Sequence, residues 1–167
     1  MENLSYGIEL LAESHNRNAF DCGVESLNCY LRQQATQDIR RNVTTVRVAA
    51  AGAEICGYYS LANTGILLSI LPDNLQKKMP RYQMLPAVLL GRLAVDLRHK
   101  GRKLGIGLLS DAFVLSLKSP LAWALFLTEA MDASAAAFYE HFGFRSLKSS
   151  PNHLYITRQE IIKVINL

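Results

Sequence analysis

Two glycines separated by one residue stand at the start of a predicted helix, in the stretch RKLGIGLL at residues 102–109. The segment ahead of it, AVLLGRLAV, is apolar apart from Arg92, which is typical of a central strand. A strand, a tight turn and glycines at a helix start expose free backbone N–H groups, and such groups bind anions. Gly105 and Gly107 would let a ligand lie against the main chain. The sequence therefore predicts an anion site here.

Two familiar phosphate motifs do not fit this stretch. No Lys-Ser or Lys-Thr follows the glycines, which excludes the pattern G-x-x-x-x-G-K-[ST]. There is also no G-x-G-x-x-G with an acidic residue at the end of a second strand. For an isolated G-x-G, the alternative is that the glycines only permit close packing of the helix on the strand.

Positive charge is concentrated in the same part of the chain. The net charge is +4, and eight basic residues lie between Gln76 and Lys103 against the single acid Asp96. A zone of this kind suggests an anionic partner, either the phosphates of a cofactor or a nucleic acid backbone. A solvated basic surface is the alternative that charge alone leaves open.

The bulk composition indicates one folded domain spanning residues 1–167. Half of the residues are hydrophobic and 19% are charged, which excludes a disordered chain. No apolar run approaches the roughly 18 residues that a membrane span requires. Glu2 and Glu9 argue against a secretion signal, so we expect a cytoplasmic protein without a membrane anchor.

Cysteine and histidine spacing gives no sign of a metal site. Cys22, Cys29 and Cys56 are odd in number and form no C-x-x-C pair, which argues against a disulfide framework or a zinc site. Buried free thiols are the favoured interpretation. The histidines share no spacing and are predicted to be surface or loop residues: His15, His99, His141 and His153.

The elements that must position the helix start alternate between strand and helix signals. Between Val24 and Arg40, apolar residues recur every four positions, which predicts a helix. Pro72 and Pro80 bracket a short helix or loop. The remaining predicted elements are strands at 7–13, 44–50, 55–68, 87–95, 123–131 and 153–156, a hairpin turn at 51–54, and helices from the glycine stretch to about 118 and at 158–165.

One further helix is predicted in DASAAAFYEHFGF. Asp132 is suited to cap its start, and Gly143 stands where a left-handed C-terminal cap is common. Phe138 and Phe142, four residues apart, would face the core. The order of elements predicts a mixed α/β fold with helices laid on a largely antiparallel sheet.

Several segments together resemble a known superfamily. Residues 102–107, RKLGIG, match [QR]-x-x-G-x-[GA], the pyrophosphate-binding signature of the GNAT superfamily of N-acetyltransferases. AAAFYEHFGF resembles the second cofactor segment of that superfamily. FDCGVESLNCYLRQQATQ, LGRLAVD and DASAAAFYEHFGF are similar to the GNAT toxins of bacterial type II toxin–antitoxin systems, with agreeing order and spacing from about Phe20 to Tyr155.

The resemblance implies a fold and a cofactor position. It implies the GNAT fold, an α/β (α+β) arrangement with a central mixed, largely antiparallel sheet flanked by helices and with acetyl-CoA in the cleft beside the central strand. The pantetheine arm would lie along Leu93, Ala94 and Val95. The pyrophosphate would rest on the backbone amides of Arg102, Lys103, Leu104, Gly105, Ile106 and Gly107.

Two residues depart from the pattern of the superfamily. Many relatives have a glycine at the position of Lys103, so this residue must keep a negative φ or tolerate a strained conformation. Asp132 stands where other branches often have asparagine, and we assign it no cofactor contact.

The chemistry implied is acetyl transfer from a thioester to an amine. By resemblance, the Tyr139 hydroxyl lies near the thioester sulfur, and a phenol with an ordinary pKa of about 10 is protonated at neutral pH, as a proton donor must be. The alternative is a core tyrosine packed beside Phe138 and Phe142. A backbone N–H near Val95 would meet the oxyanion. No carboxylate stands out as a general base.

The missing base bears on the substrate. The toxins of this type acetylate the α-amino group of aminoacyl-tRNA and block translation, and an α-amine titrates near about pH 8, so an appreciable fraction is already neutral. The basic residues would then also hold tRNA phosphates. The candidates for this contact are Arg32, Arg40, Arg41, Lys77, Lys78, Arg81 and Arg92.

The resemblance also implies partners. Such toxins are usually homodimers and are held inactive by an antitoxin with a ribbon-helix-helix DNA-binding domain. Two other functions stay open at this point. One is a GNAT N-acetyltransferase acting on a small amine, a peptide or a protein N-terminus, and the other is a non-catalytic acyl-CoA or RNA-binding module.

Overall fold

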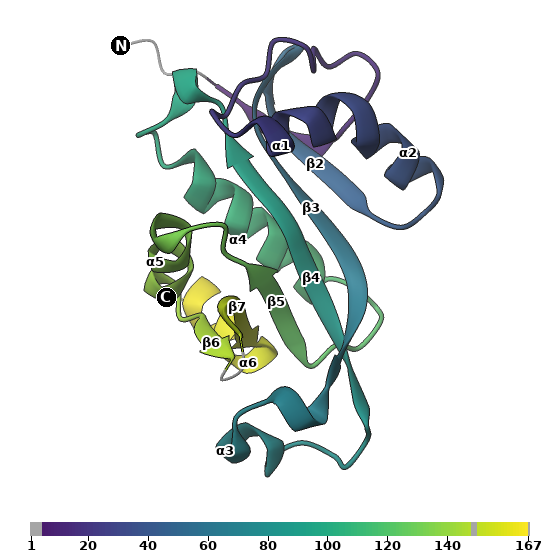
Figure 1. The fold of residues 1–167 in the computed structure, drawn as a ribbon. Coiled ribbons are helices and arrows are strands. Elements are labelled where there is room, and N and C mark those ends of the chain that lie inside the picture. The colour runs from purple at the N-terminus through teal and green to yellow at the C-terminus, as the bar shows by residue number, and fades with distance from the viewer. Residues whose placement is uncertain (1–4, 148–149, 167) are drawn as a thin grey trace. The chain divides into compact units, whose positions relative to one another are not determined.

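A computed structural model describes residues 5–147 and 150–166 (Figure 1). The chain divides into two compact units. Unit 1 comprises Met1–Ala62 and Gly91–Leu115, and unit 2 comprises Asn63–Leu90 and Ser116–Leu167. The prediction of a single domain over residues 1–167 stays a prediction.

Unit 1 contains an antiparallel set of strands. β1 (Gly7–Leu10) pairs with β2 (Thr45–Ala51), which pairs with β3 (Glu54–Leu67) through the predicted hairpin turn. β1 is shorter than the predicted strand 7–13, because the chain turns where the His15 amide donates to the Ala12 carbonyl at 3.2 Å.

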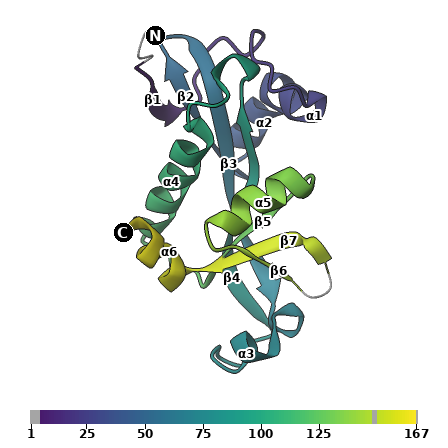
Figure 2. The same ribbon diagram turned by 90° about the vertical axis from the view of Figure 1, so that its left-hand side faces the viewer.

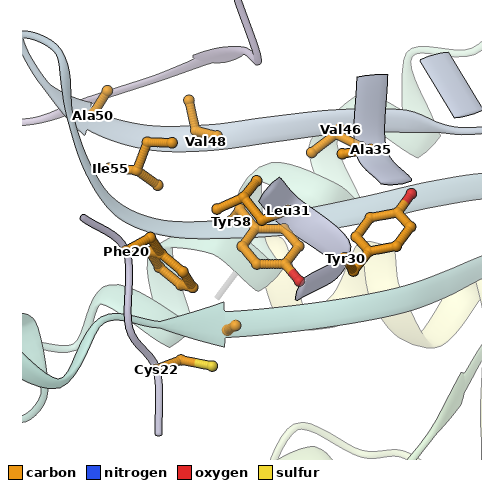
Figure 3. Packing of buried hydrophobic residues seen from close by; sticks show 11 residues of the cluster. Phe20, Cys22, Tyr30, Leu31, Ala35, Val46, Val48, Ala50, Ile55 and Tyr58 are labelled. Carbon is orange, nitrogen blue, oxygen red and sulfur yellow. The ribbon is translucent and has the colours of Figure 1, made fainter. Parts of the chain in front are cut away.

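The predicted helix over residues 24–40 is confirmed as one helical run. It consists of α1 (Glu25–Cys29), a π turn (Tyr30–Gln34) and α2 (Ala35–Arg40). Leu31 and Ala35 are fully buried on its inner face, and burying a leucine side chain contributes roughly 1.5–3 kcal/mol. Figure 3 shows this face packed on the strands, in a core formed by Phe20, Cys22, Tyr30, Leu31, Ala35, Val46, Val48, Ala50, Ile55, Tyr58 and Ala94.

The segment of most interest lies mainly in unit 1, to which residues 91–115 belong. Here β4 (Met84–Val95) runs into a 3-10 turn (Leu97–His99), and α4 (Leu104–Leu117) follows. Both the strand and the helix agree with the elements predicted around RKLGIGLL.

In unit 2, β5 (Leu125–Glu129) runs parallel to β4, with Leu125 opposite Ala87. β7 (Ser150–Thr157) is antiparallel to β5, and β6 (Arg145–Leu147) is antiparallel to β7. The strand order is β1-β2-β3-β4-β5-β7-β6. The predicted mixed, largely antiparallel sheet is therefore confirmed, whereas β6 was not predicted because three residues are too few to show an alternation.

The helices of unit 2 follow their capping signals. α5 (Ala133–His141) begins at Asp132, whose Oδ1 accepts from the Ala135 amide at 2.8 Å, and Gly143 after its end has φ +97°. α6 (Arg158–Ile165) begins with a capping box, and α3 (Asp73–Gln76) lies between β3 and β4. Figure 2 shows α5 beside β5 and β7. No helix in the described part of the chain has the length and apolar character needed to cross a membrane.

The aromatic residues of α5 pack differently from the prediction. Phe138 and Phe142 are only half-buried and contact each other with ring centroids 5.2 Å apart. Tyr139 and Phe144 are the buried aromatics of this region. The prediction that Phe138 and Phe142 face the core was wrong, because the inner face of α5 is centred one residue later.

Candidate active site

The end of β4 is fixed by one buried carboxylate, that of Asp96. This residue is 1% exposed, and its amide donates to the Cys56 carbonyl on β3 at 2.8 Å. Its Oδ1 accepts from the amide and the Nε of Arg98, both at 2.9 Å, and its Oδ2 accepts from the Asp21 amide at 3.0 Å. Asp96 therefore ties the end of the strand, the following turn and the N-terminal segment together.

The same contacts set the charge of Asp96. Burial would raise the pKa of this carboxyl, but the hydrogen bonds from the Arg98 side chain and from the Asp21 and Arg98 amides outweigh burial and lower the pKa to about 2. In the sequence, Asp96 stands out only as the lone acid among eight cations. That isolation is the one signal that could have identified it as the anchor of the turn.

The turn leads to a helix start with unpaired amides. Gly101 and Lys103 both have positive φ, +78° and +59°. The Gly107 amide donates to the Lys103 carbonyl at 3.2 Å, so Lys103 is the residue on which α4 begins. In a helix that starts there, the amides of residues 104–106 have no partner within the helix. Of the two alternatives predicted for Lys103, the structure has the strained one, which costs of order 1–3 kcal/mol.

Close packing of α4 on the sheet depends on a different glycine. A Cβ on Gly57 of β3 would lie 2.8 Å from Leu108 Cδ1 and 2.9 Å from the Ala94 carbonyl oxygen. A Cβ on Gly107 would meet only the Tyr6 hydroxyl, at 3.1 Å. Gly107 is therefore not required for helix-to-strand packing, which favours the ligand interpretation of this residue. No signal in the sequence points to Gly57, because its neighbour Leu108 lies far along the chain.

The charges at this helix start favour an anion. Arg102 and Lys103 are exposed at the N-terminus of α4, the positive end of the helix dipole. Each cation there is disfavoured by about 0.3–1 kcal/mol unless an anion compensates it. Unit 1 thus brings together both predicted cofactor segments, since the Ala94 carbonyl and the Leu104 side chain both lie next to Gly57. The segments can hold a diphosphate on amides and cations.

Tyr139 lies in unit 2, on α5. It is 6% exposed, and its ring centroid lies 5.3 Å from those of Phe138 and Phe144. Burial raises the pKa of its phenol, and an interaction with the Thr128 hydroxyl lowers it, with a net rise. Thr128 itself donates to the Leu90 carbonyl at 3.0 Å. The phenol is therefore protonated at neutral pH, as both a proton donor and a packed tyrosine would be.

Known proteins share this arrangement over nearly the whole chain, although no family model matches it. The tRNA-acetylating toxin of Mycobacterium tuberculosis is 29% identical over 152 residues, which cover 90% of each chain. The structure of AtaT complexed with acetyl-methionyl-tRNAfMet is 28% identical, with a TM-score of 0.86 over 96% of this chain and 99% of that one. The chain is a GNAT-fold homologue of the tRNA-acetylating toxins. AtaTR bound with AcCoA is similar as well, with 26% identity, a TM-score of 0.82 and coverage of 95% of this chain and 97% of that one.

In this GNAT-toxin homologue, the cations predicted to contact RNA occur in both units. Unit 2 holds Lys77, Lys78 and Arg81, which are all exposed. In unit 1, Arg41 is exposed, whereas Arg32 and Arg40 pair with Glu25 and Glu13 at 2.8 and 3.6 Å. Exposed pairs of this kind contribute little to stability, so these side chains can exchange partners.

Arg92 differs from the other six cations because its guanidinium packs on an aromatic ring. It is half-buried, and its guanidinium carbon lies 3.4 Å from the centroid of the Tyr30 ring. Tyr30 in turn donates its hydroxyl to Asp38 at 3.0 Å. Arg92 therefore has a packing role that its sequence context did not reveal.

His15 lies in a loop and His99 in the turn after β4, which fits the prediction of surface or loop residues, but neither is on the surface. His15 and His99 are buried, at 7% and 6% exposure. The Nε2 of His15 lies 2.7 Å from Glu9 Oε1, and that of His99 lies 3.0 Å from Glu54 Oε1. Each ring is buried because a glutamate satisfies its polar edge. His141 and His153 are exposed, as predicted.

The three thiols are free, and those of Cys22 and Cys56 are buried. Burial raises the pKa of both buried thiols. Among residues 5–147 and 150–166, no group of three or more His, Cys, Asp or Glu side chains is arranged to hold a metal ion.

Proposed function

We propose that this chain is an acetyl-CoA-dependent N-acetyltransferase that acetylates the α-amino group of aminoacyl-tRNA, and that it inhibits translation as the toxin of a type II toxin–antitoxin system. The observation that carries the proposal is the similarity to the tRNA-acetylating toxin over 90% of both chains. The similar structures of AtaT and AtaTR contain acetyl-methionyl-tRNAfMet and AcCoA. Relatives with this fold therefore bind both the acetyl donor and an acetylated aminoacyl-tRNA.

The helix start of α4 supports the binding of acetyl-CoA. The three amides without a partner inside the helix and the exposed cations Arg102 and Lys103 suit a diphosphate. The full set proposed to contact the diphosphate is Arg102, Lys103, Leu104, Gly105, Ile106 and Gly107. The backbone of Leu93, Ala94 and Val95 would pair with the pantetheine arm as an added strand would.

Tyr139 is the proposed catalytic acid. When acetyl-CoA is bound, it supplies the acetyl thioester. A backbone N–H near Val95 would stabilise negative charge on the carbonyl oxygen as the neutral α-amine attacks. Tyr139 would then donate its proton to the departing sulfur, for which a pKa above that of a free phenol keeps it protonated.

The cations of both units are proposed to contact tRNA phosphates. Six of them, all but Arg92, project from helices or turns and not from the core. Contacts with phosphates of this kind supply affinity that is independent of sequence and dependent on salt. The proposed residues are Arg32, Arg40, Arg41, Lys77, Lys78, Arg81 and Arg92.

Partners and compartment follow from the same function. The AtaT–AtaR complex bound to DNA is another similar structure, with 26% identity and a TM-score of 0.76. We infer a DNA-binding antitoxin of the ribbon-helix-helix type and a homodimeric enzyme for this chain. An enzyme that acts on charged tRNA works in the cytoplasm.

The test uses labelled acetyl-CoA. The protein is incubated with charged total tRNA, and parallel reactions contain uncharged tRNA, free amino acids, or peptides and proteins. We expect label only on charged tRNA, as an amide on the amino acid, so hydrolysis of the aminoacyl ester should release the label from the tRNA as N-acetyl amino acid. Label on small amines or protein N-termini, and never on charged tRNA, would favour the other acetyltransferase function. Binding of acetyl-CoA with no transfer to any amine would indicate a non-catalytic module.

A further inference from the structure

The connection between β3 and β4 is a small folded excursion within unit 2, residues 68–83, which contains α3 (Figures 1 and 2). At its base, the Leu68 amide donates to the Gln83 carbonyl at 3.0 Å. Leu71 and Leu75 are buried in a hydrophobic cluster of unit 2. The β3–β4 excursion is therefore an ordered platform, and side chains on it project from a fixed frame.

The outer side chains of the β3–β4 excursion are of two kinds. Lys77, Lys78 and Arg81 are exposed cations, and Asp73 is the one acid in the sequence of this segment. Tyr82, directly after Arg81, is 68% exposed. This is the highest exposure among the large hydrophobic residues of the described chain. The excursion thus presents an aromatic ring beside several positive charges.

An aromatic ring this exposed is suited to a partner. Burying a tyrosine is favourable because it removes a large apolar surface from water. Most of the Tyr82 side chain is still in contact with water, so a partner that covers the ring would gain this free energy. Proteins bind single-stranded nucleic acid with the same combination of groups, in which bases stack on aromatic rings and phosphates contact cations.

We propose that the β3–β4 excursion binds single-stranded RNA, with Tyr82 stacked on an unpaired base and Lys77, Lys78 and Arg81 contacting the flanking phosphates. The proposal rests on the proposed function, because aminoacyl-tRNA carries its amino acid on an unpaired 3′ end. It adds a stacking residue to the charged contacts and assigns the excursion to the single-stranded part of the substrate.

Two other occupants fit the surface less well. A duplex keeps its bases stacked inside the helix, so it offers Tyr82 no base face. A second copy of this chain, with the two-fold axis passing through the excursion, would place Lys77, Lys78 and Arg81 against their own like charges. The charge of the excursion and the exposure of the Tyr82 ring together therefore favour a single-stranded nucleic acid.

The test measures binding of two fluorescently labelled RNA hairpins, neither of which carries an amino acid, to the full chain. One hairpin has an unpaired 3′ tail of four nucleotides, and the other is blunt. We expect Tyr82→Ala to weaken binding of the tailed hairpin about tenfold, which corresponds to one stacked base, and to leave the blunt hairpin nearly unaffected. Tyr82→Phe keeps the ring and should bind like the wild type. A thermal melt checks that each variant is folded.

Four outcomes would overturn the inference. Tyr82→Ala could bind the tailed hairpin like the wild type, or lose both hairpins equally. Sedimentation could show that Tyr82→Ala dissociates a dimer without changing RNA binding, which would assign the patch to a second copy. An acidic peptide such as polyglutamate could compete as well as the tailed hairpin, which would assign it to an acidic protein. Because the hairpins carry no amino acid, this binding test does not depend on acetyl transfer. A failure to acetylate aminoacyl-tRNA would therefore contradict the proposed function without contradicting RNA binding by the excursion.

Discussion

The Gly107 amide donates to the carbonyl of Lys103, and Lys103 has φ +59°, in the left-handed region. The helix α4 therefore begins on a residue whose side chain disfavours the required backbone. Strain of this kind persists only where the surrounding structure imposes it, and here Asp96 anchors the turn that precedes it. The strained residue directly precedes the free amides proposed to bind the diphosphate.

Relief of that strain should be measurable. Lys103→Gly should raise the free energy of unfolding by about 0.5–1 kcal/mol, because glycine adopts positive φ without a steric penalty. Lys100, which is exposed and has φ −64°, provides the control. Lys100→Gly should lower stability, since glycine there only adds freedom to the unfolded chain. Urea unfolding of both variants checks the prediction, and an equal loss in the two would contradict it.

Replacement by alanine should affect stability at Gly57 but not at Gly107. Gly57→Ala should destabilise the fold by about 1–3 kcal/mol, because its Cβ would lie 2.9 Å from a backbone oxygen. Gly107→Ala should keep wild-type stability, since only the Tyr6 side chain must shift. Gly107→Val should weaken acetyl-CoA binding at least tenfold in calorimetry while the protein stays folded. Unchanged affinity would remove Gly107 from the diphosphate site.

Tyr139→Phe should lower kcat about a hundredfold and leave acetyl-CoA affinity nearly unchanged, because only the transferable proton is lost. Tyr155→Phe, which removes another buried phenol of unit 2, should keep the wild-type rate. Single-turnover transfer to charged tRNA and direct binding measurements separate the two effects. Equal losses of kcat and affinity in Tyr139→Phe would instead indicate a structural role.

The raised pKa of Tyr139 fixes the direction of its pH dependence. A donor must be protonated, so its contribution to kcat should persist to a pH above the ordinary phenol value of about 10 and be lost only as the pH rises through the raised pKa. A rate profile with saturating substrates, measured over the range in which the protein stays folded, should show no loss from this group below that value.

The Asp96 carboxylate should make stability depend on acid. Its pKa is about 2 in the folded chain, against about 3.9 in an unfolded one, so its stabilisation is present above about pH 4 and is lost as the pH falls toward 2. Asp96→Asn should lower the free energy of unfolding by about 1–3 kcal/mol at pH 7, and the difference from the wild type should shrink between pH 4 and pH 2. Asp132→Asn is the control, because asparagine caps a helix as well as aspartate does. A difference that does not change with pH would contradict the assignment.

Local signals predicted much of this fold, because they act over a few residues. The caps at Asp132 and Gly143 and the four-residue periodicity of residues 24–40 are properties of short segments, and the structure has each of them. The strand and helix around RKLGIGLL were likewise predicted from their own residues.

Features that depend on distant partners were not predictable in this way. His99 is buried only because Glu54, 45 residues earlier, satisfies its ring. Gly57 matters because Leu108 packs on it. The conformation of Lys103 was left open, since lysine itself has no preference for positive φ and the turn before it decides.

Arg92 combines a packing role with a proposed RNA contact, and the two can be separated. Its guanidinium lies 3.4 Å from the Tyr30 ring centroid, and a guanidinium stacked on a ring keeps its edge N–H groups free for phosphates. Arg92→Ala should lower the free energy of unfolding by about 1 kcal/mol, through loss of the cation–π contact and of buried side-chain stem. It should also reduce the slope of log K against log salt for RNA binding by about one.

Arg92→Lys distinguishes the two roles because it keeps the charge and loses the planar group. We expect it to retain the wild-type salt slope while recovering little of the lost stability. Lys78→Ala, at an exposed position in unit 2, should change the slope and leave urea unfolding unchanged. If Arg92→Ala lowers stability and leaves the salt slope of RNA binding unchanged, Arg92 has only a packing role in the core of unit 1. The exposed cations would then make the RNA contacts without it.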